Sequence, residues 1–231
     1  MNSNDKSNKK TKKRKHKNPF RFFFFDFVKW TGAPSALIWL RPKRLYESKA
    51  AKKHIRGKAV VVANHTDISD PLTLHCALWY RRPRIIAMKE LFEKKISAFF
   101  FRNMLCIPVD RQNFNMDTYR TSVDVLAEDS ILCIFPEGRI NTDGANIQSF
   151  KSGAVLMALK GGAPIVPVYI APRKRWYSRS VTVVGEPIDP NKLTDGKPTI
   201  RAIEEITQII HEKEIALMEI YNAWKTKKSS K

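Results

Sequence analysis

The run Ala59-Val60-Val61-Val62-Ala63-Asn64-His65 decides the fold class of this chain of 231 residues. Five consecutive small or β-branched residues are typical of a strand buried on both faces, because a half-exposed strand would alternate apolar and polar side chains. Similar apolar runs recur downstream, and longer stretches of helical pattern separate them. This alternation predicts an α/β fold with a mostly parallel central sheet flanked by helices.

The remaining elements follow from the same two patterns. Strands are predicted at 84–87, 105–109, 131–135, 165–170 and 181–184. Helices are predicted near 71–81, 91–102, 116–129 and 150–161, and a last helix near 199–224 is expected to pack on the sheet. Ligands of such sheets bind where strands end and helices begin. Polar residues at those corners are therefore the candidates for chemistry.

Composition predicts one domain with charged ends. The chain is 43% hydrophobic, which suffices for one sizeable core, and we expect that domain over 46–225. Residues 1–19 hold eight Lys or Arg against one Asp and are predicted to be a disordered basic tail, while 226–231 form a basic C-terminal tail. The net charge of +20 favours an anionic partner, which is nucleic acid, acidic lipid or an acidic carrier protein.

An aromatic segment separates the basic tail from the domain. Between Phe20 and Leu40 the chain is rich in Phe, Trp and aliphatic residues, but Asp26 and Lys29 interrupt it and Gly32 and Pro34 indicate a break. A membrane-spanning helix would need about 20 mainly apolar residues. We therefore predict that 20–45 is a membrane-interface helical segment made of two short helices, with aromatic side chains at the headgroup boundary and cations near phosphates.

The cysteines indicate a reducing compartment. Cys76, Cys106 and Cys133 are odd in number, lack metal-like spacing and lie in apolar runs, so we expect buried, reduced thiols. The amino terminus also lacks the order of a secretory signal. The expected location is the cytoplasmic face of the cell membrane, as a peripheral or monotopic protein.

His65 and Asp70 are the candidate catalytic pair. The strand at 59–63 runs directly into His65, and Asp70-Pro71 is expected to cap and open the next helix. Pairing the two side chains requires the segment 64–70 to be an irregular loop. A carboxylate bonded to Nδ1 of a histidine leaves Nε2 free to act as a general base, and the nucleophile can then be a hydroxyl of the substrate.

Alternatives to this pair have less support. Asp67 is nearer to His65 in sequence and competes as its partner, and a metal site of His65, Asp70 and His75 lacks zinc-like spacing. His75 is expected to pack within its helix. A hydrolase using the same pair would need a nucleophile, but the sequence has no Gly-x-Ser-x-Gly elbow.

Cationic residues follow the ends of three predicted strands. These residues are Lys89, Arg111 and Arg139. Gly138 permits close backbone approach to a ligand, and an arginine can grip a phosphate with two hydrogen bonds. Lys151 is expected to open a helix whose amino-terminal dipole also favours an anion. Surface ion pairs with Glu90 or Asp110 are the alternative role for these charges.

Four ordered blocks resemble the glycerolipid acyltransferase family that includes the 1-acyl-sn-glycerol-3-phosphate (lysophosphatidic acid) acyltransferases. The resemblance extends over residues 35–190. The blocks are Asn64-His65-x4-Asp70-Pro71, Ile107-Pro108-Val109-Asp110-Arg111, Phe135-Pro136-Glu137-Gly138-Arg139 and Ile165-Val166-Pro167-Val168. One departure is that Arg139 follows Gly138 directly, where the family commonly has a Thr between them.

The resemblance implies a role for each site residue. His65 would be the general base and Asp70 would orient it. The acceptor phosphate would be held by Lys89, Arg111 and Arg139, in a pocket shaped by Glu137 and Gly138. The departure after Gly138 leaves the acceptor open between lysophosphatidic acid, another lysophospholipid and glycerol-3-phosphate.

The same resemblance implies the substrates and partners. An acyl thioester, acyl-CoA or acyl-carrier protein, would donate the acyl group to the sn-2 hydroxyl of the lysophospholipid substrate, with no cofactor and no metal. An anionic membrane surface is the expected partner. Nucleic acid is not expected, because no helix-turn-helix or RNA-binding fingerprint is present. A basic lipid- or nucleic-acid-binding module remains the alternative from another class.

Overall fold

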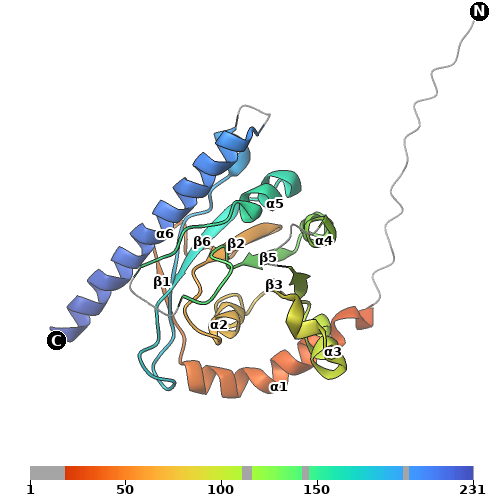
Figure 1. The fold of residues 1–231 in the computed structure, drawn as a ribbon. Coiled ribbons are helices and arrows are strands. Elements are labelled where there is room, and N and C mark those ends of the chain that lie inside the picture. The colour runs from red at the N-terminus through yellow and green to blue at the C-terminus, as the bar shows by residue number, and fades with distance from the viewer. Residues whose placement is uncertain (1–18, 111–115, 142–145, 195–197, 231) are drawn as a thin grey trace, which may run out of the picture.

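The computed structural model describes residues 19–110, 116–141, 146–194 and 198–230, and it confirms the α/β fold (Figure 1). Its seven-stranded sheet has the order β1-β7-β6-β2-β5-β3-β4. The strands are β1 (Lys43–Tyr46), β2 (Ala59–Ala63), β3 (Arg84–Met88), β4 (Ile107–Val109), β5 (Ile131–Ile134), β6 (Ile165–Ile170) and β7 (Val181–Val184). All neighbours pair in parallel except β6 and β7, which pair antiparallel. The sheet is therefore mostly parallel, as predicted.

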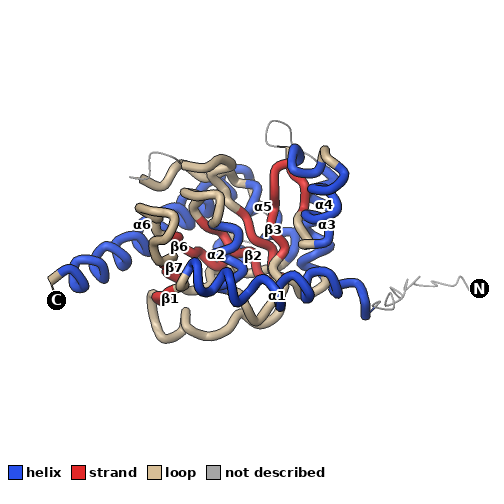
Figure 2. The backbone as a smooth tube through the Cα atoms, turned by 90° about the horizontal axis from the view of Figure 1, so that it is seen from below, coloured by secondary structure: helices blue, strands red, loops and turns tan. Residues whose placement is uncertain are grey.

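Helices cover both faces of the sheet. They are α1 (Phe23–Leu40), α2 (Asp70–Ala77), α3 (Lys95–Asn103), α4 (Met116–Ala127), α5 (Gly153–Gly161) and α6 (Ile200–Ser229). Short 3-10 turns are η1 (Pro19–Phe22), η2 (Lys89–Phe92) and η3 (Pro190–Leu193). Figures 1 and 2 show α4, α5 and α6 on one side of the sheet and α1 and α2 on the other.

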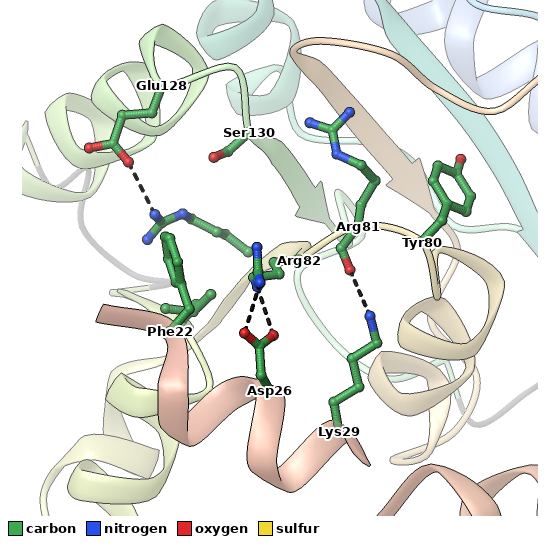
Figure 3. A pocket seen from close by; sticks show the side chains of 10 residues that line it. Phe22, Asp26, Lys29, Tyr80, Arg81, Arg82, Glu128 and Ser130 are labelled. Atoms are coloured by element: carbon green, nitrogen blue, oxygen red, sulfur yellow. Dashed lines mark hydrogen bonds and ion pairs between the residues drawn. The ribbon is translucent and has the colours of Figure 1, made fainter. Parts of the chain in front are cut away.

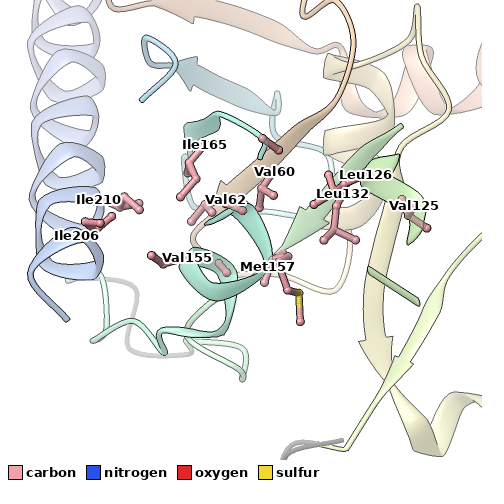
Figure 4. Packing of buried hydrophobic residues seen from close by; sticks show 14 of the residues in the cluster. Val60, Val62, Val125, Leu126, Leu132, Val155, Met157, Ile165, Ile206 and Ile210 are labelled. Atoms are coloured by element: carbon pink, nitrogen blue, oxygen red, sulfur yellow. The ribbon is translucent and has the colours of Figure 1, made fainter. Parts of the chain in front are cut away.

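Strand β2 organises the core because it lies in the middle of the sheet with all five residues buried. Its side chains alternate between two hydrophobic clusters. Val60 and Val62 belong to the cluster with α4, α5 and α6, and Figure 4 shows them between Leu126 on one side and Ile206 on the other. Val61 belongs to the opposite cluster, which includes Leu74 of α2. The unbroken apolar run therefore reflects a strand covered on both faces.

The amino-terminal segment differs from its prediction. Residues Phe23–Leu40 form one helix that continues through Gly32 and Pro34, so the two short helices predicted here are wrong. Buried contacts at Phe25, Ala36 and Leu40 hold the helix against the domain, and such packing overrides the local cost of Gly and Pro. Among the described residues, none of the helices combines the length and apolar content that a bilayer crossing requires.

Both boundaries of the predicted domain also move. The residues after Leu40 do not stay helical up to 45, because Lys43–Tyr46 form β1, an edge strand parallel to β7. At the other end α6 continues to Ser229, through most of the stretch 226–231 that was expected to be a tail. Residues 1–18 lie outside the described part of the chain.

The three cysteines are free thiols. Cys133 is buried in β5, whereas Cys76 and Cys106 are only half-buried, which corrects the prediction that all three are buried. Burial raises the pKa of the Cys106 thiol to about 12, which keeps it protonated at neutral pH.

Candidate functional site

The loop between β2 and α2 brings His65 and Asp70 together. Nδ1 of His65 lies 3.0 Å from Oδ2 of Asp70, and the two residues are 8% and 1% exposed. Residues 64–69 follow an irregular path, as the pairing requires. The predicted cap is displaced by one residue, since Ser69 occupies the N-cap position and Asp70 is the first residue of α2. The bond to Nδ1 leaves Nε2 as the ring nitrogen that can take up a proton.

Backbone donors of the same loop fix the Asp70 carboxylate. Its Oδ2 accepts hydrogen bonds from the N–H groups of Thr66 at 2.7 Å and Asp67 at 2.8 Å. The competing carboxylate of Asp67 instead accepts from the N–H of Ser69 at 2.7 Å. Burial acts to raise the pKa of Asp67, but the hydrogen bonds from Ser69 together with the charges of Arg173 and His65 lower it overall. Asp70 is therefore the partner of His65.

Residues after β5 enclose His65 from a second side. The ring of Phe135 stacks on the imidazole, with the ring centroids 4.2 Å apart and the planes 22° apart. The N–H of Asn141 donates to the carbonyl of His65 at 2.6 Å. The N–H of His65 donates to Oε1 of Glu137 at 3.2 Å. Because β5 is the direct neighbour of β2, the third sequence block lies against the first.

Two carboxyl groups are buried behind this loop. Burial raises the pKa of Glu137 to about 7, although the N–H of His65 acts in the opposite direction. Glu214 of α6 is fully buried, and burial followed by the charge of Glu137 raises its pKa well above the ordinary value. The backbone N–H of Asn64, the residue before His65, acts on the Glu214 carboxyl group in the opposite direction. Sequence reasoning missed Glu214, because it occupies one position in a long amphipathic helix.

Two exposed cations, Arg139 and Lys151, lie at the Gly138 turn that follows β5. Gly138 has a φ of 71°, which only glycine adopts readily, and a Cβ added there would lie 3.4 Å from Nζ of Lys151. Nε of Arg139 donates to Oε1 of Gln148 at 2.9 Å, and both Arg139 and Lys151 are exposed. Lys151 lies two residues before the start of α5, so it does not open that helix as predicted. It adjoins the Gly138 turn instead.

Lys89 lies farther from the pair. Its Nζ bonds to Oδ2 of Asp110 at 2.6 Å, which is the ion pair considered as the alternative role for the strand-end charges. In the sheet order β3 is two strands away from β2, a lateral distance of about 10 Å. Arg111, the third predicted phosphate ligand, lies outside the described residues.

Arg173 is a charge beside the site that sequence reasoning missed. Its Nη1 donates to Oγ of Ser69 at 3.0 Å, and its guanidinium lies 4.6 Å from the ring centroid of Trp39 in α1. The residue follows the end of β6, so the strand-end criterion applied to Lys89 and Arg139 would have found it. Arg173 joins the His65–Asp70 loop, residues 64–69, to the carboxyl end of α1.

The structure gives His75 a packing role. Its ring centroid lies 5.6 Å from that of Phe25, and burial lowers its pKa to about 4, so it is neutral at pH 7. In the ranges that the structure describes, no group of three or more His, Cys, Asp and Glu side chains could hold a metal.

Comparisons with known proteins agree with the four sequence blocks. The family model "Acyltransferase" matches residues 40–171, more than half of the chain. The 1-acyl-sn-glycerol-3-phosphate acyltransferase of Bacillus subtilis is 31% identical over 134 residues, which cover 56% of this chain and 66% of the relative. That of Limnanthes douglasii is 26% identical over 171 residues, covering 69% of this chain and 59% of the relative. The chain thus spans less than two thirds of either relative.

A solved structure has the same fold. It is the 1-acyl-sn-glycerophosphate (LPA) acyltransferase PlsC from Thermotoga maritima, which is 21% identical and superposes with a TM-score of 0.61 over 87% of this chain and 81% of that one. At this identity the likeness concerns the fold alone. The family match covers β2 to β6 with the His65–Asp70 loop and the Glu137 loop. This chain therefore belongs to the acyltransferase family that its four sequence blocks resemble.

Proposed function

We propose that the chain is a 1-acyl-sn-glycerol-3-phosphate acyltransferase, which moves a fatty acyl group from an acyl thioester to the sn-2 hydroxyl of lysophosphatidic acid and so produces phosphatidic acid. The 3.0 Å bond between Nδ1 of His65 and Oδ2 of Asp70, at the carboxyl end of the central strand, carries this proposal. It supports a general base whose tautomer is fixed. The relatives named for this reaction support the substrate class.

In the proposed reaction Nε2 of His65 removes the proton of the acceptor hydroxyl while that oxygen attacks the thioester carbonyl. The resulting tetrahedral intermediate collapses, the C–S bond breaks and the thiolate leaves, and the imidazolium can return the proton to it. General-base catalysis of this kind typically supplies a factor of about 10²–10⁴. The remainder comes from positioning and from stabilising the negative oxygen of the intermediate.

The acceptor phosphate is assigned to the cations around the Gly138 turn. Arg139 and Lys151 are exposed there, and Gly138 leaves its backbone accessible. Lys89, which is paired with Asp110, and Arg111 complete the set implied by the family resemblance. Because no Thr separates Gly138 from Arg139, another lysophospholipid or glycerol-3-phosphate is the second candidate acceptor.

We also propose that an anionic membrane surface is the partner of the apolar face formed by α1 and α3. Large exposed apolar side chains gather there, namely Phe20, Phe23, Phe27, Trp30, Ile38, Ile96 and Phe99. Phe24 of α1 contacts Phe99 and Phe100 of α3, so the two helices form one surface. Ile68 of the His65–Asp70 loop is 84% exposed and adds an apolar group beside the site. Such patches mark membrane or partner contacts.

Two aspartates of one loop allow a matched test of the mechanism. Asp70→Asn is expected to lower acyl transfer by about 10²-fold or more, because the amide no longer orients and stabilises the imidazole. Asp67→Asn should leave the rate of acyl transfer within a few-fold of the parent rate, because the Asp67 carboxylate bonds to Ser69. His65→Ala should abolish transfer with folding and vesicle binding intact. Normal transfer by His65→Ala protein would contradict the mechanism.

The substrates are identified by product analysis. Purified protein is offered lysophosphatidic acid, other lysophospholipids and glycerol-3-phosphate, each with labelled acyl-CoA or acyl-carrier protein. We expect labelled phosphatidic acid as the main product. Preferential labelling of another acceptor would support acyl transfer but contradict lysophosphatidic acid as the acceptor.

A further inference from the structure

A cavity of about 340 Å³, lined by several charged side chains, lies at the end of the sheet opposite to His65, where the strands begin. Its walls come from the start of α1, the turn after α2, the first residue of β3 and the turn between α4 and β5 (Figure 3). Parallel strands place their starting ends together, so this cavity is separate from the corner where β2 and β5 end. None of the roles described above uses it.

The cavity has an excess of positive charge. Its charged lining consists of Lys29, Arg81, Arg82, Arg84, Asp26 and Glu128. Four cations and two carboxylates leave two positive charges in excess. A site with this balance attracts an anion of charge near minus two.

The two carboxylates each already face an arginine. Asp26 accepts two hydrogen bonds from Arg82, both at 2.7 Å (Figure 3), and Oε2 of Glu128 accepts from Arg84 at 3.2 Å. The side-chain hydrogen bonds of Lys29 go to neutral acceptors, which are the carbonyls of Trp79 and Arg81. A carbonyl satisfies a donor without cancelling its charge.

Arg81 is bound in the same way as Lys29. Its guanidinium donates to the carbonyls of Ile55 at 3.0 Å, Gly57 at 2.9 Å and Asp129 at 2.5 Å. Burial lowers the pKa of Lys29, and the charge of Arg82 lowers it further although Asp26 acts in the opposite direction. An anion in the cavity would offset both the burial of the Lys29 charge and its repulsion from Arg82.

Helix α1 connects the cavity to the exposed apolar face. Asp26 and Lys29 point into the cavity, whereas Phe27 and Trp30 are 56% and 87% exposed. Each exposed residue is one position after a cavity residue, which corresponds to about 100° around the helix. A lipid headgroup can therefore enter the cavity while its acyl chains stay beside the aromatic side chains of the same helix.

We propose that this cavity binds the phosphate monoester headgroup of an anionic membrane lipid, at a site separate from the catalytic pair. Arginine and lysine are the side chains that bind phosphate most strongly. A monoester carries close to two negative charges at neutral pH, which matches the excess, whereas the diester of an ordinary anionic phospholipid carries one. Monoester lipid is preferred over diester lipid for this reason.

Vesicle binding tests the proposal without an activity assay, and therefore independently of the proposed function. Binding is measured on vesicles of phosphatidylcholine with either phosphatidic acid or phosphatidylglycerol, adjusted to equal surface charge. The parent protein should prefer phosphatidic acid. Lys29→Gln should weaken binding to those vesicles by about tenfold, the effect of one charge-assisted hydrogen bond. Asp26→Asn, which adds to the positive excess, should strengthen it several-fold.

Lys95→Gln is the matched control, because Lys95 is an exposed lysine of α3 on the apolar face and outside the cavity. It should weaken binding to both kinds of vesicle alike. The site would be overturned if Lys29→Gln and Lys95→Gln lost equal affinity for both kinds of vesicle. Equal binding of the parent protein to phosphatidic acid and phosphatidylglycerol vesicles would overturn it as well. Should Lys29→Gln fail to fold, unchanged or weaker binding by Asp26→Asn would overturn it too.

Inorganic phosphate separates the two possible sources of the group. Millimolar phosphate should displace the parent from phosphatidic acid vesicles only weakly, since it lacks the acyl chains that contact α1. Full displacement, together with loss of the preference for phosphatidic acid, would overturn the lipid assignment.

Discussion

The carboxyl groups of Glu137 and Glu214 are buried beside the His65–Asp70 loop. Burial raises the pKa of both, to about 7 for Glu137 and well above the ordinary value for Glu214. A carboxyl group with a raised pKa in the folded state binds its proton more tightly there than in the unfolded chain. The resulting stabilisation is complete below the ordinary pKa of 4.5 and is lost as the pH rises through about 7.

Glu137→Gln should remove this dependence at one position. The interval from 4.5 to about 7 corresponds to at most about 3 kcal/mol of unfolding free energy. Relative to the variant, the parent protein should therefore lose up to that amount between about pH 4.5 and about pH 7.5. Urea unfolding at a series of pH values measures the difference. Glu204→Gln, on the exposed face of α6, is the control. A parent-to-variant difference that does not change with pH would refute the burial argument.

The sequence predicted the part of the site that lies within one loop. His65 and Asp70 are five residues apart and their loop adjoins a recognisable buried strand, so local pattern sufficed. The contact with Glu137 depends on β5 being the neighbour of β2, and strand order does not follow from local pattern. For Lys89 the sequence predicted a place near the pair that the sheet order does not support. A position at the end of a strand does not reveal how many strands separate that strand from β2.

The segment of helix α1 was predicted to be helical, but it was wrongly divided into two helices. Gly32 and Pro34 are local signals of a break, whereas the contacts of Ala36 and Leu40 that keep the helix continuous are tertiary. Strand β1 was missed for a related reason. Lys43 and Arg44 do not look like strand residues, and only pairing with β7 at the edge of the sheet makes them so.

Phe25 and Phe23 of α1 form a natural pair of tests. Phe25 is 1% exposed and contacts His75, whereas Phe23 is 66% exposed. Phe25→Ala should lower the free energy of unfolding by about 3–5 kcal/mol, because it leaves a cavity. Phe23→Ala should change it by less than about 0.5 kcal/mol and should instead weaken vesicle binding. Chemical denaturation and vesicle cosedimentation measure the two effects. Equal stability losses would show that α1 does not pack as described.

At the scale of the whole molecule, the proposed membrane docking would combine two attractions that differ in range. A net charge of +20 attracts an anionic surface from a distance, while the exposed aromatic face of α1 acts only on contact. Salt screens the first, since the Debye length falls from about 10 Å at 0.1 M to about 3 Å at 1 M. Burial of apolar surface does not depend on screening.

Salt should therefore separate the contributions of the basic amino-terminal stretch and of α1. Residues 1–18 carry eight Lys or Arg, each worth up to about 1 kcal/mol near an anionic surface. Deleting them should weaken binding to anionic vesicles strongly at about 0.05 M NaCl and little at about 0.5 M. Trp30→Ala, at an 87% exposed position, should weaken binding similarly at both. Cosedimentation across a salt series measures both effects. If the effect of the deletion persisted at high salt, this stretch would bind by something other than its charge. If the effect of Trp30→Ala disappeared at high salt, the apolar contact would not contribute to docking.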